Sequence, residues 1–171
     1  LGESQYEAGQ YDAARKSVNK FLLSSYSKTS VYANQARYTY AYVLMRQKRY
    51  DEALETLREL DKRIAKAEDK TSVMMRNDIH NRMGDCLYVN SRFAESIVQY
   101  DKVIDAKGKD ADYATYQKAL AYGAQGKNSD KLTYLNYIFE RYDNSPLKSK
   151  AMLEIANTYM MCDNNEMAMT Y

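Results

Sequence analysis

The sequence predicts an all-α fold, and three features of the 171-residue chain lead to this expectation. Its composition favours helices, because one proline and six glycines leave few helix breakers among many alanines, leucines, lysines and glutamates. Apolar residues recur at intervals of three and four, as in Leu54, Leu57, Leu60 and Ile64, which places them on one side of a helix. A short pattern of turn, aromatic and small residues also repeats along the chain.

The repeated pattern is clearest in three six-residue segments, 9–14, 48–53 and 91–96. Each has a turn residue, an aromatic residue two positions later and a small residue three positions after that, which is the layout of a joint between two helices. A small residue also marks the first helix of each unit, at positions 2, 41, 84, 119 and 156, with spacings of 39, 43, 35 and 37 residues. One helix pair cannot bury its apolar stripe alone, so neighbouring pairs are expected to stack.

This arrangement resembles the tetratricopeptide repeat (TPR), in which a large residue precedes Gly or Ala in the first helix and the second helix carries Tyr, Ala and Phe. The residues that carry the resemblance are Tyr40, Ala41, Tyr50 and Ala53 in one unit and Met83, Gly84, Phe93 and Ser96 in the next. The resemblance implies an α-α superhelix, a right-handed TPR solenoid of about five antiparallel helix pairs. A weaker unit has Asn128 and Lys131 where the aromatic and the small residue belong.

We expect a single TPR domain over residues 1–171. Its units are predicted at about 1–26, 30–67, 71–106, 110–142 and 146–171. Both ends fall inside a unit, so we expect the chain to be a fragment of a longer array.

The joint at 139–146 is similar to the Tyr-Pro-x-Ser joint of bacterial envelope TPR proteins, the outer-membrane assembly lipoprotein and the Tol–Pal coordinator among them. Residues 26–30 are similar to this joint as well. In both segments another residue stands in place of the proline after Tyr, Asp143 in the first and Ser27 in the second. The resemblance implies a periplasmic or outer-membrane-associated location. No stretch approaches the roughly 20 apolar residues of a membrane helix, so no direct membrane insertion of this segment is predicted.

Few residues could support catalysis, and a non-enzymatic protein without cofactor or metal is expected. His80, the one histidine, could pair with Asp78 or Asp85 as an acid–base couple, but in the repeat it occupies a position that packs between helices. Cys86 and Cys162 fall in different units, so we expect their Cα atoms to be farther apart than the roughly 7 Å that a disulfide tolerates. Both cysteines are predicted to be buried small hydrophobes.

The 18 tyrosines indicate binding, because Tyr offers a large apolar area at small entropic cost together with one hydroxyl. Solenoids bind partners on the inner face of their first helices. On this face the repeat predicts Tyr38, Tyr42, Met45, Arg46, Asn81, Asp85, Tyr88, Tyr113, Tyr116, Leu120, Leu153, Asn157 and Met160. The alternative is that these rings only fill gaps between long helices.

The expected function is a protein–protein interaction scaffold that binds a partner protein or peptide in the concave groove. The alternative is a carbohydrate- or small-ligand-binding repeat domain of a bacterial envelope protein, since Tyr rings also stack on sugars. Nucleic acid is not expected as a partner, because a net charge of +2 supplies little attraction for phosphates. Open solenoid ends also allow self-association.

Overall fold

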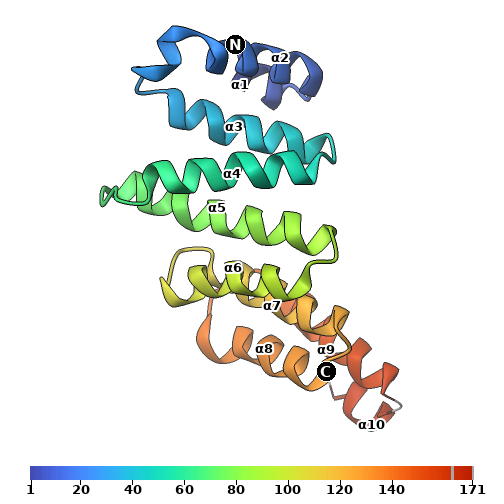
Figure 1. The fold of residues 1–171 in the computed structure, drawn as a ribbon. Coiled ribbons are helices and arrows are strands. Elements are labelled where there is room, and N and C mark those ends of the chain that lie inside the picture. Colours follow the sequence, from blue (N-terminus) through green and yellow to red (C-terminus); the bar gives the residue numbers. More distant parts are fainter. Residues whose placement is uncertain (163, 171) are drawn as a thin grey trace. The chain divides into compact units, whose positions relative to one another are not determined.

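A computed structural model describes residues 1–162 and 164–170, and the part of the chain that it describes is helical without strands (Figure 1). The α-helices are α1 (Gly2–Glu7), α2 (Tyr11–Leu23), α3 (Ala33–Arg46), α4 (Tyr50–Ile64), α5 (Lys70–Val89), α6 (Phe93–Asp105), α7 (Ala111–Ala124), α8 (Asn128–Arg141), α9 (Lys148–Met161) and α10 (Asn165–Ala168). A short 3-10 helix, η1 (Ser25–Lys28), follows α2. The predicted all-α solenoid fold is confirmed.

The helix α2 ends at Leu23, because serine side chains offer its last carbonyls an alternative to the helical ladder. The Ser24 hydroxyl donates to the Phe21 carbonyl at 2.6 Å, and the Ser27 hydroxyl donates to the Leu22 carbonyl at 2.7 Å. The backbone of Ser24 is extended, so the chain leaves the helix there.

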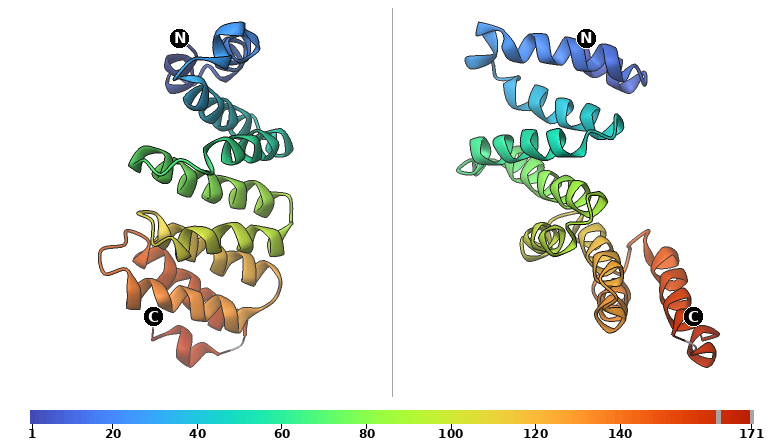
Figure 2. Two further views of the ribbon diagram at one scale, coloured as in Figure 1. Left: turned by 60° about the vertical axis from the view of Figure 1, so that its left-hand side comes forward. Right: turned by 45° about the vertical axis from the view of Figure 1, so that its right-hand side comes forward.

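The chain divides into two compact units, unit 1 (Leu1–Asn90) and unit 2 (from Ser91 onward), which are described separately. In unit 1 the helices α1 to α5 follow one another in chain order, with η1 between α2 and α3, and unit 2 contains the helices α6 to α10 (Figure 2). The expectation of a single domain stays a prediction.

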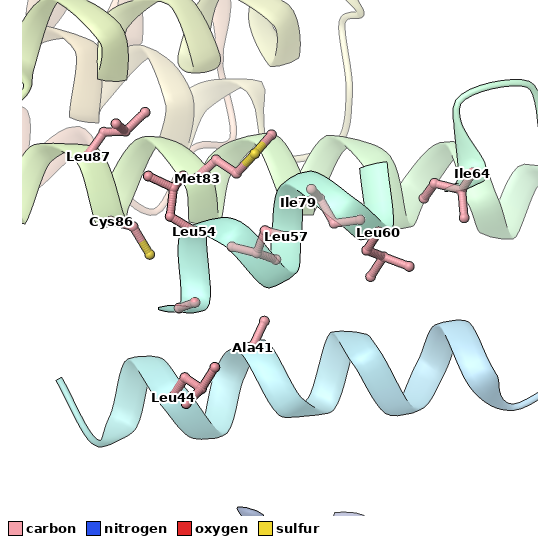
Figure 3. Close-up of a cluster of buried hydrophobic side chains, with 11 residues drawn as sticks. Ala41, Leu44, Leu54, Leu57, Leu60, Ile64, Ile79, Met83, Cys86 and Leu87 are labelled. Carbon is pink, nitrogen blue, oxygen red and sulfur yellow. The ribbon is translucent and has the colours of Figure 1, made fainter. Parts of the chain in front are cut away.

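The core of unit 1 is built around the apolar stripe of α4. Leu54, Leu57, Leu60 and Ile64 are all buried, as their spacing predicts. Figure 3 shows this stripe between the helices on either side, with side chains of α3 and α5 directed at it. The neighbours are Ala41 and Leu44 of α3 and Ile79, Met83, Cys86 and Leu87 of α5.

Unit 2 has two smaller buried clusters. One consists of Ala119, Leu135, Ile138, Ala151 and Ile155, which come from α7, α8 and α9. The other consists of Tyr100, Val103 and Ala114, with Ile104 packed against it. In the larger cluster α8 therefore packs between α7 and α9, as α4 packs between α3 and α5 in unit 1.

Small residues occur where neighbouring helices approach closely. Ala14, Ala53 and Ser96 are fully buried at equivalent places in the second helices of their pairs. A Cβ atom added to Gly2 would lie 2.5 Å from the Cγ2 atom of Val18, so α1 and α2 leave no room for a side chain there. The small positions of the repeat are therefore required by helix packing.

The fourth unit departs from the repeat at Lys131, and the structure shows how the longer side chain is accommodated. A Cβ atom on Gly123 of α7 would lie 2.7 Å from the Cδ atom of Lys131. The missing side chain of Gly123 therefore leaves room for the lysine, which stands where other units have alanine or serine. The Lys131 ammonium then reaches α9, where it donates to the Glu154 carboxylate at 2.7 Å. In this pair the small residue of the helix contact is thus on α7 and not on α8.

The turns between paired helices use a left-handed residue at one recurring place. Gly9 and Gly126 each have φ of 73°, while Lys48 and Ser91 adopt φ of 59° and 58° at the equivalent positions. Glycine adopts such angles without the Cβ clash that other residues suffer. These four joints thus share one turn conformation, and two of the four carry glycine.

We predict that Gly126→Ala lowers the free energy of unfolding by about 1 kcal/mol, because alanine at positive φ is strained. The measurement is the urea midpoint followed by circular dichroism. Lys127→Ala in the same turn is the matched control, since its φ is −87° and no strain arises. An unchanged midpoint for Gly126→Ala would contradict the assigned turn.

Candidate functional site: a tyrosine face on unit 1

A hydrogen-bonded network joins the first helices of successive pairs in unit 1. Tyr38 and Tyr42 lie one turn apart on α3, and their hydroxyls both donate to the Oδ2 atom of Asp78 on α5, at 2.6 and 2.5 Å. The Tyr38 hydroxyl also lies 3.2 Å from the Tyr42 hydroxyl. One carboxylate therefore holds two half-buried rings in place.

Arginine balances the charge of this carboxylate. The Nε atom of Arg82, one turn along α5, lies 3.4 Å from the Oδ1 atom of Asp78. The same guanidinium donates to the Asp85 carboxylate at 2.6 Å. The aromatic rings and the charged groups of α5 thus belong to one connected network.

The network continues to α1 through Tyr6. The Tyr6 ring meets the Tyr42 ring nearly edge-on, with centroids 6.3 Å apart. The Tyr6 hydroxyl interacts with the fully exposed guanidinium of Arg46, whose pKa it raises. We call Tyr6, Tyr38, Tyr42, Asp78 and Arg82 the tyrosine face.

Burial and the neighbouring carboxylate raise the pKa of both central tyrosines. For Tyr38 the largest cause is burial, followed by its hydrogen bond to Asp78. For Tyr42 burial is again largest, followed by the negative charge of Asp78. Both hydroxyls therefore stay protonated at neutral and moderately alkaline pH, and both act as donors.

The predicted residues of unit 1 fall into two groups. Tyr38, Tyr42, Arg46 and Asp85 lie on or beside the tyrosine face, and Tyr88 is half-buried on α5. Asn81 and Met45 do not offer the predicted accessible surface. Asn81 is fully buried, with neither amide atom hydrogen-bonded, and Met45 packs against the apolar core. The repeat position alone did not show this difference in burial.

The predicted residues of unit 2 come from two helices. Tyr113, Tyr116 and Leu120 of α7 are half-buried, and Tyr116 packs against the larger core cluster. The three residues of α9 are exposed and lie at helical spacing on one side of that helix. They are Leu153, Asn157 and Met160.

Sequence reasoning missed three members of the tyrosine face, Tyr6, Asp78 and Arg82. Asp78 precedes the predicted Asn81 by three residues, but Asn81 is buried, so this spacing did not indicate an accessible carboxylate. Tyr6 lies four residues after the small Gly2, as the core-packed Met45 lies four after Ala41, so the repeat did not mark Tyr6 as a surface residue. Nothing in the sequence indicated that Arg82 would link Asp78 and Asp85.

A second polar cluster, also missed, surrounds Lys118 in unit 2. This buried ammonium donates to the Asp101 carboxylate of α6 at 2.5 Å and lies 4.0 Å from the centroid of the Tyr134 ring. Tyr134 stacks on Tyr122, with centroids 5.3 Å apart. The charged lysine is paired, so it can remain inside the helix stack.

The histidine and cysteines have mainly structural surroundings. His80 is buried, and its Nε2 atom lies 3.6 Å from the Oδ1 atom of Asp61 on α4. Both cysteines are free, and burial raises the pKa of the Cys86 thiol to about 12. The prediction for Cys162 was wrong, because it is exposed at the end of α9.

Metal-binding and membrane-spanning features were sought among the described residues. Within that part of the chain, no group of three or more His, Cys, Asp or Glu side chains could hold a metal ion. No described helix is both long enough and apolar enough to cross a bilayer.

Comparison with known proteins supports the tetratricopeptide-repeat assignment. Residues 1–69 match the family described as tetratricopeptide repeat. No curated protein sequence matches the chain. The bacterial envelope subfamily stays a prediction.

Solved structures show the same fold over the whole chain. A crystal structure of MamA is 16% identical with a TM-score of 0.77, and the match covers 100% of this chain and 90% of MamA. TPR-like repeats of a putative kinesin light chain from Podospora anserina are 16% identical with a TM-score of 0.76, covering 99% of this chain and 87% of theirs. YrrB, a TPR protein with an unusual peptide-binding site, is 17% identical with a TM-score of 0.69, covering 98% of this chain and 77% of YrrB.

We predict that Asp78→Asn allows Tyr38 and Tyr42 to ionise at lower pH, because the substitution removes the negative charge and the carboxylate acceptor that help raise their pKa. The rise of tyrosinate absorbance for these two residues is expected to begin at a lower pH in the variant than in the wild type. Asp85→Asn on the same helix is the control, since the carboxylate that accepts from both hydroxyls belongs to Asp78.

The same raised pKa values predict a loss of stability in alkali. A folded-state pKa above the unfolded value of about 10 contributes stability that is complete below pH 10 and declines above it, because the unfolded chain then releases protons more readily. The decline in urea midpoint above pH 10 is expected to be shallower for Asp78→Asn. Equal slopes in the two proteins would contradict this account.

Proposed function

We propose that this chain is a non-enzymatic protein–protein interaction scaffold that binds a segment of a partner protein across the tyrosine face of unit 1. The observation that carries the proposal is the fixing of Tyr38 and Tyr42 by one carboxylate of α5. Rings held in this way lose little further freedom on binding, which favours affinity. Protein interfaces are enriched in Tyr and Arg, and both occur here.

The fold is consistent with this function. YrrB, which shares the fold at low identity, is a TPR protein with an unusual peptide-binding site. The remaining predicted residues, on α7 and α9 of unit 2, are a separate candidate surface of that unit. Of these, the exposed Leu153, Asn157 and Met160 are the accessible candidates.

The stacked tyrosine pair of unit 2 gives no support to the carbohydrate alternative. Sugar recognition needs an aromatic face open to the ligand. In the stacked pair of unit 2, Tyr122 and Tyr134 cover one another, and Lys118 lies over Tyr134. The peptide proposal is therefore preferred.

The test is capture of partners on the immobilised 171-residue chain. Envelope extracts are used first, because the joint at 139–146 is similar to those of envelope TPR proteins. We predict that Tyr42→Ala lowers recovery of a specific partner at least about tenfold, as expected for a central interface tyrosine.

Tyr26→Ala is the matched control, because Tyr26 is 78% exposed on η1 and lies outside the tyrosine face. Tyr116 is unsuitable as a second site, since it packs against the core and its loss would disturb unit 2. Helicity of each variant is checked by circular dichroism. Equal recovery with the wild type and Tyr42→Ala would rule out the tyrosine face as the binding surface.

A further inference from the structure

A small cavity opens beside the tyrosine face, between α1 and α3. Its volume is about 260 Å³. It is lined by Glu3, Tyr6 and Glu7 of α1 and by Gln35, Tyr38, Thr39 and Tyr42 of α3. Small-molecule pockets usually occupy about 300–1,000 Å³, so this cavity is better suited to one side chain than to a whole ligand.

The cavity lining is acidic. It contains two carboxylates, Glu3 and Glu7, and neither lysine nor arginine. Glu3 accepts a hydrogen bond of 3.2 Å from the neutral amide of Gln35, while the exposed Glu7 takes part in no hydrogen bond or ion pair among the described residues. Two negative charges are thus left without a cation in the lining, which favours a positively charged occupant.

The aromatic part of the lining favours the same occupant. Tyr38 and Tyr42 direct their hydroxyls at Asp78 on α5, and the two rings are tilted by 52° with centroids 4.9 Å apart. Tyrosine ring faces attract ammonium and guanidinium groups within about 6 Å. The tyrosine rings and the glutamate carboxylates therefore both attract a cation.

The chain uses this pairing elsewhere in its own structure. The Cζ atom of Arg141 lies 3.7 Å from the centroid of the Tyr137 ring in α8. Arg46 interacts in turn with the Tyr6 hydroxyl, although Arg46 does not line the cavity. Guanidinium groups are thus compatible with the tyrosines of this protein.

We propose that the cavity between α1 and α3 receives an arginine side chain of the bound partner, an assignment that rests on the proposed function. Arginine is preferred to lysine because its planar guanidinium can stack on a tyrosine ring while donating two parallel hydrogen bonds to a glutamate. Glu7 supplies the free carboxylate, and Tyr6, Tyr38 and Tyr42 supply the rings. The partner segment is accordingly basic at this position.

The test uses the side chain alone as the probe. N-acetyl-arginine amide is titrated into the 15N-labelled chain, with N-acetyl-citrulline amide as a neutral ligand of nearly the same shape. Saturable shifts are expected for amides of α1 and α3 with the arginine compound and none with citrulline. Lysine amide is expected to bind several-fold more weakly than arginine amide.

Substitutions then locate the site. Glu3→Gln with Glu7→Gln is expected to weaken arginine binding about tenfold, from the loss of two exposed ion pairs. Glu68→Gln, an exposed glutamate before α5, is the matched control and should leave binding unchanged. Both acidic positions are exposed, so the folded structure should persist in the double variant.

Equal binding of arginine and citrulline amides, or arginine binding that the double glutamine variant leaves unchanged, would overturn the assignment. If lysine amide bound as tightly as arginine amide, the cavity would be a general cation site and the assignment to arginine would be wrong. These outcomes differ from failure of the proposed function. A partner lost with Tyr42→Ala but retained by the double glutamine variant would leave the tyrosine face in place and remove only the arginine assignment.

Discussion

Burial of the apolar stripe of α4 is the constraint on which unit 1 depends. Leu54, Leu57 and Leu60 face in directions that α3 alone cannot cover, so α5 must pack on the other side (Figure 3). Both neighbours approach closely only because positions such as Ala41 and Ala53 are small. The left-handed residues in the turns reverse the chain, so that the two helices of a pair run antiparallel. Loss of any of these features would expose the stripe to water.

This packing also decides where a recognition surface can form. Asp78 lies 40 residues from Tyr38 and 36 from Tyr42 along the chain, yet its carboxylate accepts hydrogen bonds from both. The contact exists because α4 holds α3 and α5 at a fixed separation. The half-buried rings are consequently rigid before any partner arrives. Tyr6 extends the same surface to α1, where the acidic cavity lies.

Unit 2 shows that the repeat tolerates charged residues where their charge is paired. Lys131 stands at a position that other units fill with alanine or serine, and it is accommodated by Gly123 and by the carboxylate of Glu154. Lys118 is buried against Asp101 and an aromatic ring. Removing either partner would leave a poorly solvated ammonium, which costs more than the pair itself contributes. Different helix pairs thus keep the same packing with different residues at their contacts.

The sequence by itself determined the helices, their stripes and their small contact positions. These features follow from local propensity and from a periodicity of three and four residues, so a single chain reveals them. It also indicated Tyr38, Tyr42 and Arg46 as surface candidates. Only the tertiary structure decided that Asn81 is buried, that Cys162 is exposed and that Asp78 joins two tyrosines. Such contacts depend on the rotation and separation of packed helices, and a change of a few ångströms in either breaks a hydrogen bond without altering the sequence pattern.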